Sequence, residues 1–76
     1  MKVRYKINNR VKQYRLSAGN MTQQELADQT GVTRQTIHSI EKGRYNPSIG
    51  LALKIAQILA VPIDKLFSLN EGIHYD

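Results

Sequence analysis

The stretch from Arg34 to Lys42 carries side chains that suit contacts with nucleic acid. When successive residues are placed about 100° apart on a helix, Ile37 and Ile40 fall close together and form its only apolar anchor. The residues on the opposite arc are polar or basic: Arg34, Gln35, His38, Ser39 and Lys42. Arginine can bond guanine through two hydrogen bonds and glutamine can do the same for adenine, while lysine and serine suit phosphate oxygens. The alternative is an ordinary solvated helix face, although such a face more often mixes glutamate with lysine.

This stretch needs neighbouring helices to hold it, and the sequence contains signals for them. Turns with glycine or proline divide the middle of the chain into five short blocks with helical spacing of apolar residues. The predicted helices cover residues 9–18, 23–30, 34–42 and 49–60, and a short fifth helix begins at Pro62. The expected N-terminal caps are Asn8 or Asn9, Thr22, Thr33 and Ser48.

The second predicted helix has the strongest start signal. Thr22 and Glu25 have the spacing of a capping box, and Met21 and Leu26 have that of a hydrophobic staple. Gly31 is expected to end this helix shortly before the next one begins. Two short helices joined by a tight glycine turn, with the polar face on the second, are typical of the helix-turn-helix arrangement. Its second helix enters the major groove of DNA.

The two ends of the chain have a different pattern. Val3, Tyr5 and Ile7 alternate with basic residues, which predicts a strand. Residues 72–75 are either a second short strand or a frayed tail. The ends therefore either pair as strands or remain loose.

Composition limits the possible classes of protein. The 76 residues make one small domain, and 11 Lys and Arg against 6 Asp and Glu give a net charge of +5. This basic balance fits nucleic-acid binding, although ribosomal and membrane-surface proteins share it. The absence of cysteine excludes disulfides and thiolate zinc sites and fits a cytoplasmic protein. Neither a membrane span nor a signal peptide is expected, since the longest apolar run is residues 58–61.

The segment TQQELADQTGVTRQTIHSIEKGRYNPS, residues 22–48, resembles the phage Cro and repressor family, the Xre-type regulators. Members of the family have a small residue inside the first motif helix, a glycine at the turn and two aliphatic residues in the second motif helix. The matching residues here are Ala27, Gly31, Ile37 and Ile40. The similarity continues through IGLALKIAQILAVPIDKLF and covers about residues 9–67. It implies an all-α, compact five-helix, lambda-repressor-like domain with the helix-turn-helix at helices 2 and 3. The turn at residues 19–21 and the glycine at position 50 depart from the pattern.

The resemblance also implies roles for individual residues. The expected base-reading residues are Thr33, Arg34, Gln35, His38 and Ser39, although His38 could instead touch phosphate or have no role. The expected contacts with the DNA backbone are Thr22, Gln23, Lys42, Arg44, Tyr45 and Asn46. Of these, Thr22 could serve only as a cap, and Tyr45 could pack on the domain edge. A structural ion pair between Arg15 and Glu41 is expected to fix the angle of the DNA-reading helix.

The function implied by this resemblance is sequence-specific regulation of transcription. The expected regulator is a repressor that binds an inverted-repeat operator on double-stranded DNA as a homodimer. Residues 1–8 are expected to form a basic arm or strand, residues 9–67 the DNA-binding domain and residues 68–76 a tail that contributes to dimer contacts. The alternative is an antitoxin-like protein that binds a protein partner and its own operator. We expect no enzyme activity, cofactor or metal, and RNA fits less well because an aromatic stacking surface is missing.

Overall fold

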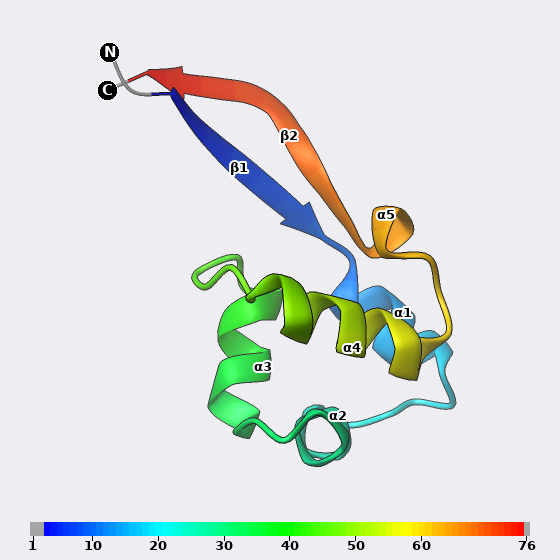
Figure 1. Ribbon diagram of the computed structural model, residues 1–76. Coiled ribbons are helices and arrows are strands. Elements are labelled where there is room, and N and C mark those ends of the chain that lie inside the picture. The colour runs from blue at the N-terminus through cyan, green and yellow to red at the C-terminus, as the bar shows by residue number, and fades with distance from the viewer. Residues whose placement is uncertain (1–2, 76) are drawn as a thin grey trace.

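The computed structural model describes the backbone of residues 3–75 and the side chains of residues 6–69. Within this part of the chain, five short helices form one body and the two ends form a two-stranded ribbon (Figure 1). The elements are β1 (Val3–Asn9), α1 (Val11–Ser17), α2 (Gln23–Thr30), α3 (Arg34–Glu41), α4 (Ile49–Leu59), α5 (Ile63–Leu66) and β2 (Phe67–Tyr75). The predicted five-helix fold with a helix-turn-helix at α2 and α3 is confirmed.

The core lies where the apolar stripes of all five helices meet. Helix α4 supplies four buried residues at helical spacing, Ala52, Ile55, Ala56 and Leu59. The other members of the core are Val11, Leu26, Ala27, Ile37, Ile40 and Leu66. Burial of large aliphatic side chains contributes about 1.5–3 kcal/mol each, so this cluster is the main source of stability.

Side-chain caps fix the start of three helices. Thr22 accepts a hydrogen bond from the amide of Glu25, and the Glu25 carboxylate accepts one from the amide of Thr22, both at 3.0 Å. This is the predicted capping box. The hydroxyls of Thr33 and Ser48 cap α3 and α4 in the same way, each at 3.2 Å. The sequence therefore predicted these three starts correctly.

The turn between α2 and α3 depends on Gly31, which adopts the left-handed conformation with φ of 77°. Its amide donates to the carbonyl of Ala27 at 2.9 Å, and the amide of Val32 donates to the same carbonyl at 3.1 Å. Residues with a side chain rarely adopt this conformation, which explains the glycine. The turn fixes the crossing of α2 and α3.

Two expected helix starts are wrong by one or two residues. The N-terminal cap of α1 is Arg10, which makes no capping side-chain bond, whereas Asn9 still belongs to β1. The side chain of Asn9 nevertheless accepts from the amide of Val11 at 3.2 Å. Pro62 is the cap of α5 rather than its first residue. In both places the chain remains extended for longer than the local pattern indicates.

The ends of the chain pair as antiparallel strands. Residues Val3, Ile7 and Asn9 have Tyr75, Leu69 and Phe67 as their partners. The ribbon extends away from the helices (Figure 1). At its base, the side-chain amide of Asn9 donates to the carbonyl of Ile40 at 2.8 Å. This bond connects the ribbon to the last turn of α3.

Candidate nucleic-acid interface

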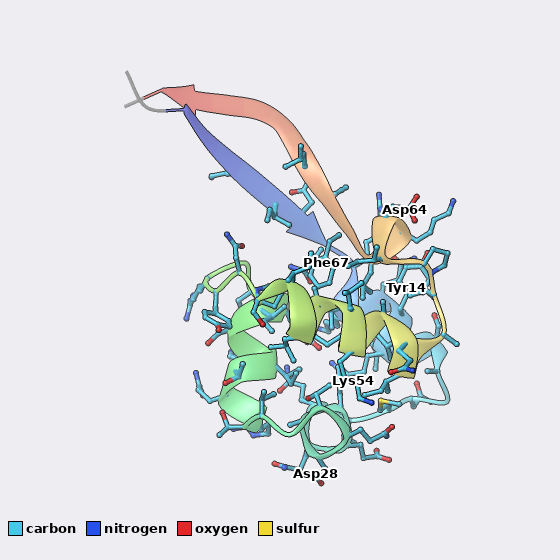
Figure 2. All side chains as sticks on the ribbon, in the orientation of Figure 1. Tyr14, Asp28, Lys54, Asp64 and Phe67 are labelled. Carbon is cyan, nitrogen blue, oxygen red and sulfur yellow. The ribbon has the colours of Figure 1, made fainter. Side chains whose placement is uncertain are left out.

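Helix α3 presents a polar face while its apolar side enters the core. Ile37 and Ile40 are fully buried. The side chains of Arg34 and Gln35 are exposed, and those of His38 and Ser39 are half-buried. Side chains project from the side of α3 that faces away from α4 (Figure 2). The predicted orientation of the helix is therefore correct, with His38 less exposed than its neighbours.

The first turn of α3 is capped by a threonine side chain, and a shallow pocket lies on its outer side. The hydroxyl of Thr33 caps the helix and also lies 3.0 Å from the hydroxyl of Thr36. Four residues line a shallow pocket on the outer side: Gln35, Thr36, Ser39 and Tyr45. Sequence reasoning missed Thr36, which the helical wheel places on a flank. Its position three residues after a capping threonine is the signal that could have found it.

The segment after α3 carries exposed basic and polar side chains next to this face. Gly43 adopts a left-handed φ of 74° and turns the chain, and the amide of Arg44 donates back to the carbonyl of Ser39 at 2.9 Å. Lys42, Arg44 and Asn46 are exposed. Tyr45 is 47% exposed and lines the pocket together with residues of α3. The positive charge of this segment suits phosphate oxygens.

The N-terminus of α2 lies beside the polar face of α3. Thr22 uses its hydroxyl in the capping box. The side chain of Gln23 points toward α3, where its Nε2 donates to the carboxylate of Glu41 at 3.0 Å. Its backbone amide belongs to the first turn of the helix, where amides have no partner within the helix and can bind anions.

Arg15 and Glu41 form the predicted ion pair. Arg15 Nε lies 2.7 Å from Glu41 Oε2, and Arg15 Nη2 donates to Glu41 Oε1 at 3.2 Å. Their side chains are only 7% and 4% exposed. Arg15 Nη1 also donates to the carbonyl of Met21. The pair thus joins α1, the segment before α2 and the end of α3.

Among the residues that the structure describes, no three His, Asp or Glu side chains are grouped as metal ligands. The same residues include no helix that is both long and apolar enough to cross a membrane.

Comparison with known proteins agrees with this geometry. The helix-turn-helix family model matches residues 11–66. An HTH-type transcriptional regulator of Methanocaldococcus jannaschii is 49% identical over 61 residues, which are 80% of this chain and 91% of that protein. The control protein C.BamHI of Bacillus amyloliquefaciens is 37% identical over 59 residues, 78% of this chain and 73% of that protein.

The fold has a counterpart among solved structures. The crystal structure of a "putative DNA-binding protein" from Bacteroides fragilis superimposes with a TM-score of 0.74 and 27% sequence identity. The match covers 82% of this chain and 98% of that chain. The chain therefore belongs to the Cro- and repressor-type helix-turn-helix family and is a DNA-binding regulator of transcription, not an enzyme.

Proposed function

We propose that this regulator is a repressor that recognises an inverted-repeat operator as a homodimer. The observation that carries the proposal is the polar face of α3, held outward by the buried Ile37 and Ile40. The buried pair of Arg15 and Glu41 fixes the end of the same helix. A rigid helix with exposed hydrogen-bonding groups suits the major groove, where base edges carry a distinct pattern.

In this proposal two sets of residues contact DNA. Bases are read by Thr33, Arg34, Gln35, His38 and Ser39, with Arg34 directed to guanine and Gln35 to adenine. The phosphate backbone is bound by Thr22, Gln23, Lys42, Arg44, Tyr45 and Asn46. For Gln23 the backbone amide is the group that suits a phosphate, since the side chain already bonds Glu41.

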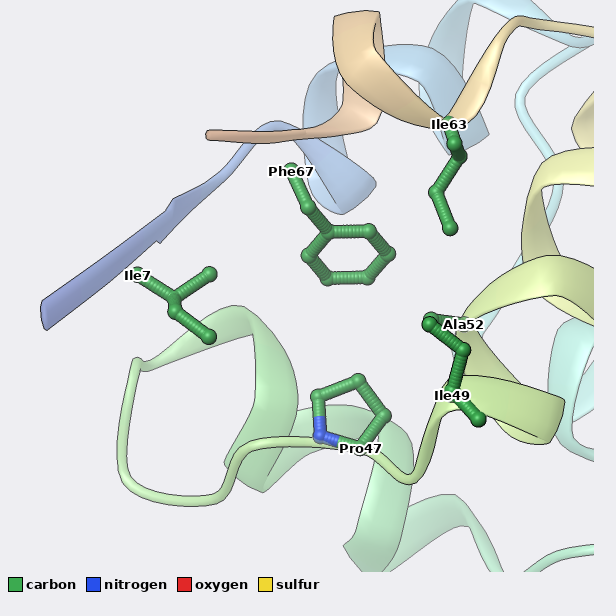
Figure 3. Close-up of a pocket in the computed structure, with 6 residues that line it drawn as sticks. All are labelled: Ile7, Pro47, Ile49, Ala52, Ile63 and Phe67. Atoms are coloured by element: carbon green, nitrogen blue, oxygen red, sulfur yellow. The ribbon is translucent and has the colours of Figure 1, made fainter. Parts of the chain in front are cut away.

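A hollow between the ribbon and α4 supports the homodimer. It is lined by apolar residues, which are Ile7, Pro47, Ile49, Ala52, Ile63 and Phe67 (Figure 3). Nearby on α4 and β2, Ile49, Leu53 and Leu69 are 76%, 52% and 62% exposed. Exposed apolar patches of this kind mark interaction sites on small proteins. We propose that a second copy covers this surface, with the arm of residues 1–8 and the tail of residues 68–76 taking part.

Two short DNA-reading helices related by a two-fold axis match a two-fold symmetric site. A bound dimer then represses transcription by occupying the operator in the cytoplasm and so blocking access of RNA polymerase to the DNA. The alternative is an antitoxin-like protein, in which the same hollow receives a different protein.

The direct experiment selects bound sequences from random duplex DNA at a fixed salt concentration. We expect an inverted repeat with half-site centres about 34–36 Å apart. A single half-site would argue against the dimer, and the absence of any enriched sequence would contradict sequence-specific repression. Size-exclusion analysis of the purified chain then separates the homodimer from a monomer that requires another protein.

The Arg34→Ala variant tests the role of the reading helix. We expect a loss of about 1–3 kcal/mol at the selected site and relaxed preference at one base position, because the bidentate bonds to a base edge are removed. The Lys42→Ala variant is the comparison. It should weaken all sequences equally and reduce the salt slope by about one unit. If Arg34→Ala behaves like Lys42→Ala, Arg34 contacts only phosphate.

A further inference from the structure

We infer that Asn9 is a positioning residue that connects the paired ends of the chain to the turn after α3, and so to the segment that binds the DNA backbone. The inference rests on the proposed function, because it assumes that residues 42–46 contact phosphate. It gives the base of the ribbon a role in DNA binding that requires no contact between the ribbon and the DNA.

The turn after α3 is closed by two backbone hydrogen bonds in the pattern that ends many helices. The amide of Gly43 donates to the carbonyl of Ile40 at 3.0 Å. The amide of Arg44 donates to the carbonyl of Ser39 at 2.9 Å. Gly43 has the left-handed φ, 74°, that this motif requires. The turn therefore sets the direction in which the chain continues along the polar face of α3.

Asn9 reaches this turn from the ribbon. It is the last residue of β1, it pairs with Phe67 of β2, and its Nδ2 donates to the carbonyl of Ile40 at 2.8 Å. That carbonyl thus accepts one hydrogen bond from within the turn and one from a residue 31 positions away. A backbone carbonyl has two lone pairs, so the two bonds are compatible. The side chain of Asn9 therefore attaches the turn to the base of the ribbon.

The orientation of the Asn9 amide is determined by its two partners. Its Oδ1 accepts from the amide of Val11 at 3.2 Å, at the start of α1. The amide of Val11 can only donate and the carbonyl of Ile40 can only accept, so a flipped side chain would lose both bonds. Aspartate has the same shape and would keep the acceptor for Val11, but it has no donor for Ile40. The position therefore needs a side chain that both donates and accepts.

The consequence for DNA binding follows from what the turn carries. Lys42, Arg44 and Asn46 are exposed there and are the proposed phosphate contacts. A segment that is already ordered loses less conformational entropy when it binds. Without the bond from Asn9 the turn loses its attachment to the ribbon, so its residues become more mobile and bind phosphate less tightly. Because phosphate contacts carry no sequence information, the loss should be equal for all DNA sequences.

The neighbouring residue in β1 provides a matched control. Asn9→Asp and Asn8→Asp add the same negative charge, but Asn8 is exposed, whereas Asn9 is half-buried. Thermal melting checks that both variants fold. If Asn9→Asp does not fold, Asn9→Ser replaces it, with Asn8→Ser as its control. A serine hydroxyl can still accept from the amide of Val11 but is too short to reach Ile40.

Hydrogen exchange of the chain without DNA tests the attachment directly. The amides of Gly43 and Arg44 should exchange about 3- to 10-fold faster in Asn9→Asp than in Asn8→Asp, as expected for the loss of one hydrogen bond. The amide of Ile55, in the buried part of α4, should change less. Equal acceleration at both places would indicate a general loss of stability. That result, or no acceleration at the turn, overturns the inference.

The binding measurement compares the selected duplex with one of scrambled sequence. Asn9→Asp should bind both about 3- to 10-fold more weakly than Asn8→Asp. In a chain that already carries Lys42→Ala and Arg44→Ala, this difference should shrink to less than about twofold. A difference of unchanged size overturns the inference and leaves the proposed function intact. If the parent chain prefers no DNA sequence, the proposed function fails, while hydrogen exchange and the scrambled duplex still decide whether Asn9 positions the turn.

Discussion

At the scale of single residues, Arg15 and Glu41 form a buried ion pair that holds α3 against α1. Both charges are almost fully withdrawn from water, and three hydrogen bonds from Arg15 satisfy Glu41 and the carbonyl of Met21. Such a pair contributes little net stability compared with apolar residues, but removing one member leaves the other charge buried without its partner. The pair therefore specifies where α3 lies more than it stabilises the fold.

The Arg15→Leu variant should lose about 3–5 kcal/mol of unfolding free energy, because Glu41 stays buried without its cation. Chemical denaturation measures this loss. Arg10→Leu is the matched control, since Arg10 is exposed and, among the described residues, its side chain makes one long bond of 3.4 Å to the carbonyl of Lys65. A loss at Arg15 no larger than that at Arg10 would show that the pair does not hold α3.

The sequence predicted the outward face of α3 and the ion pair, but not the hydrogen bond from the Gln23 side chain to Glu41. Helical periodicity places Glu41 on the core flank, because that depends only on spacing within one helix. The bond from Gln23 to Glu41 depends on how α2 crosses α3, which one helix alone cannot reveal. Thr36 was missed for a similar reason. Whether it lines the outer pocket depends on how the chain after α3 places Tyr45 beside it, and the spacing within α3 does not show this.

At the scale of elements, local signals explain most of the helix limits. Thr22, Thr33 and Ser48 cap their helices as expected, since a capping bond spans only three residues. Gly31 ends α2 with a positive φ. The start of α1 was predicted too early because Asn9 is held in the ribbon by Phe67, a residue far away in sequence.

Two glycines should respond to alanine with opposite signs. Gly50 lies within α4, its φ is not positive and no atom lies within 4 Å of an added Cβ, so Gly50→Ala should stabilise by about 0.5–1 kcal/mol. At Gly31, with φ of 77°, the same change should destabilise by about 1–2 kcal/mol. Melting temperatures of the two variants check both signs. Equal effects at both sites would contradict the assigned backbone conformations.

At the scale of the whole molecule, the ribbon is the least expected feature. Alternation at the N-terminal end predicted a strand, while residues 72–75 could have been either a strand or a frayed tail. The pairing of the two ends joins residues more than 50 positions apart and has no local signal. An isolated two-stranded ribbon is marginally stable in water. Its base is fixed by the bond from Asn9 to Ile40 and by one from the amide of Arg10 to the carbonyl of Leu66 at 2.8 Å. A second copy against the apolar hollow would stabilise it further.

Ile49→Lys tests that dimer surface, because Ile49 lines the hollow and is 76% exposed, and two-fold symmetry would introduce two lysines into one apolar contact. We expect the dimer dissociation constant to rise about tenfold or more while the helices stay folded. Sedimentation velocity and circular dichroism measure the two properties. Leu16→Lys is the control, since Leu16 is exposed on α1 and does not line the hollow. Equal effects of the two variants would show that the dimer contact does not lie at this hollow.

The central claim is that the outward face of α3 contacts the bases of DNA. A 15N NMR titration of the chain with its selected duplex, compared with a scrambled duplex of equal length, tests it most directly. We predict that the scrambled duplex shifts mainly the amides of residues 22–23 and 42–46, which bind phosphate, while the selected duplex also shifts those of residues 33–39. Shifts confined to α4, α5 and the ribbon, with none in α3, would contradict the claim.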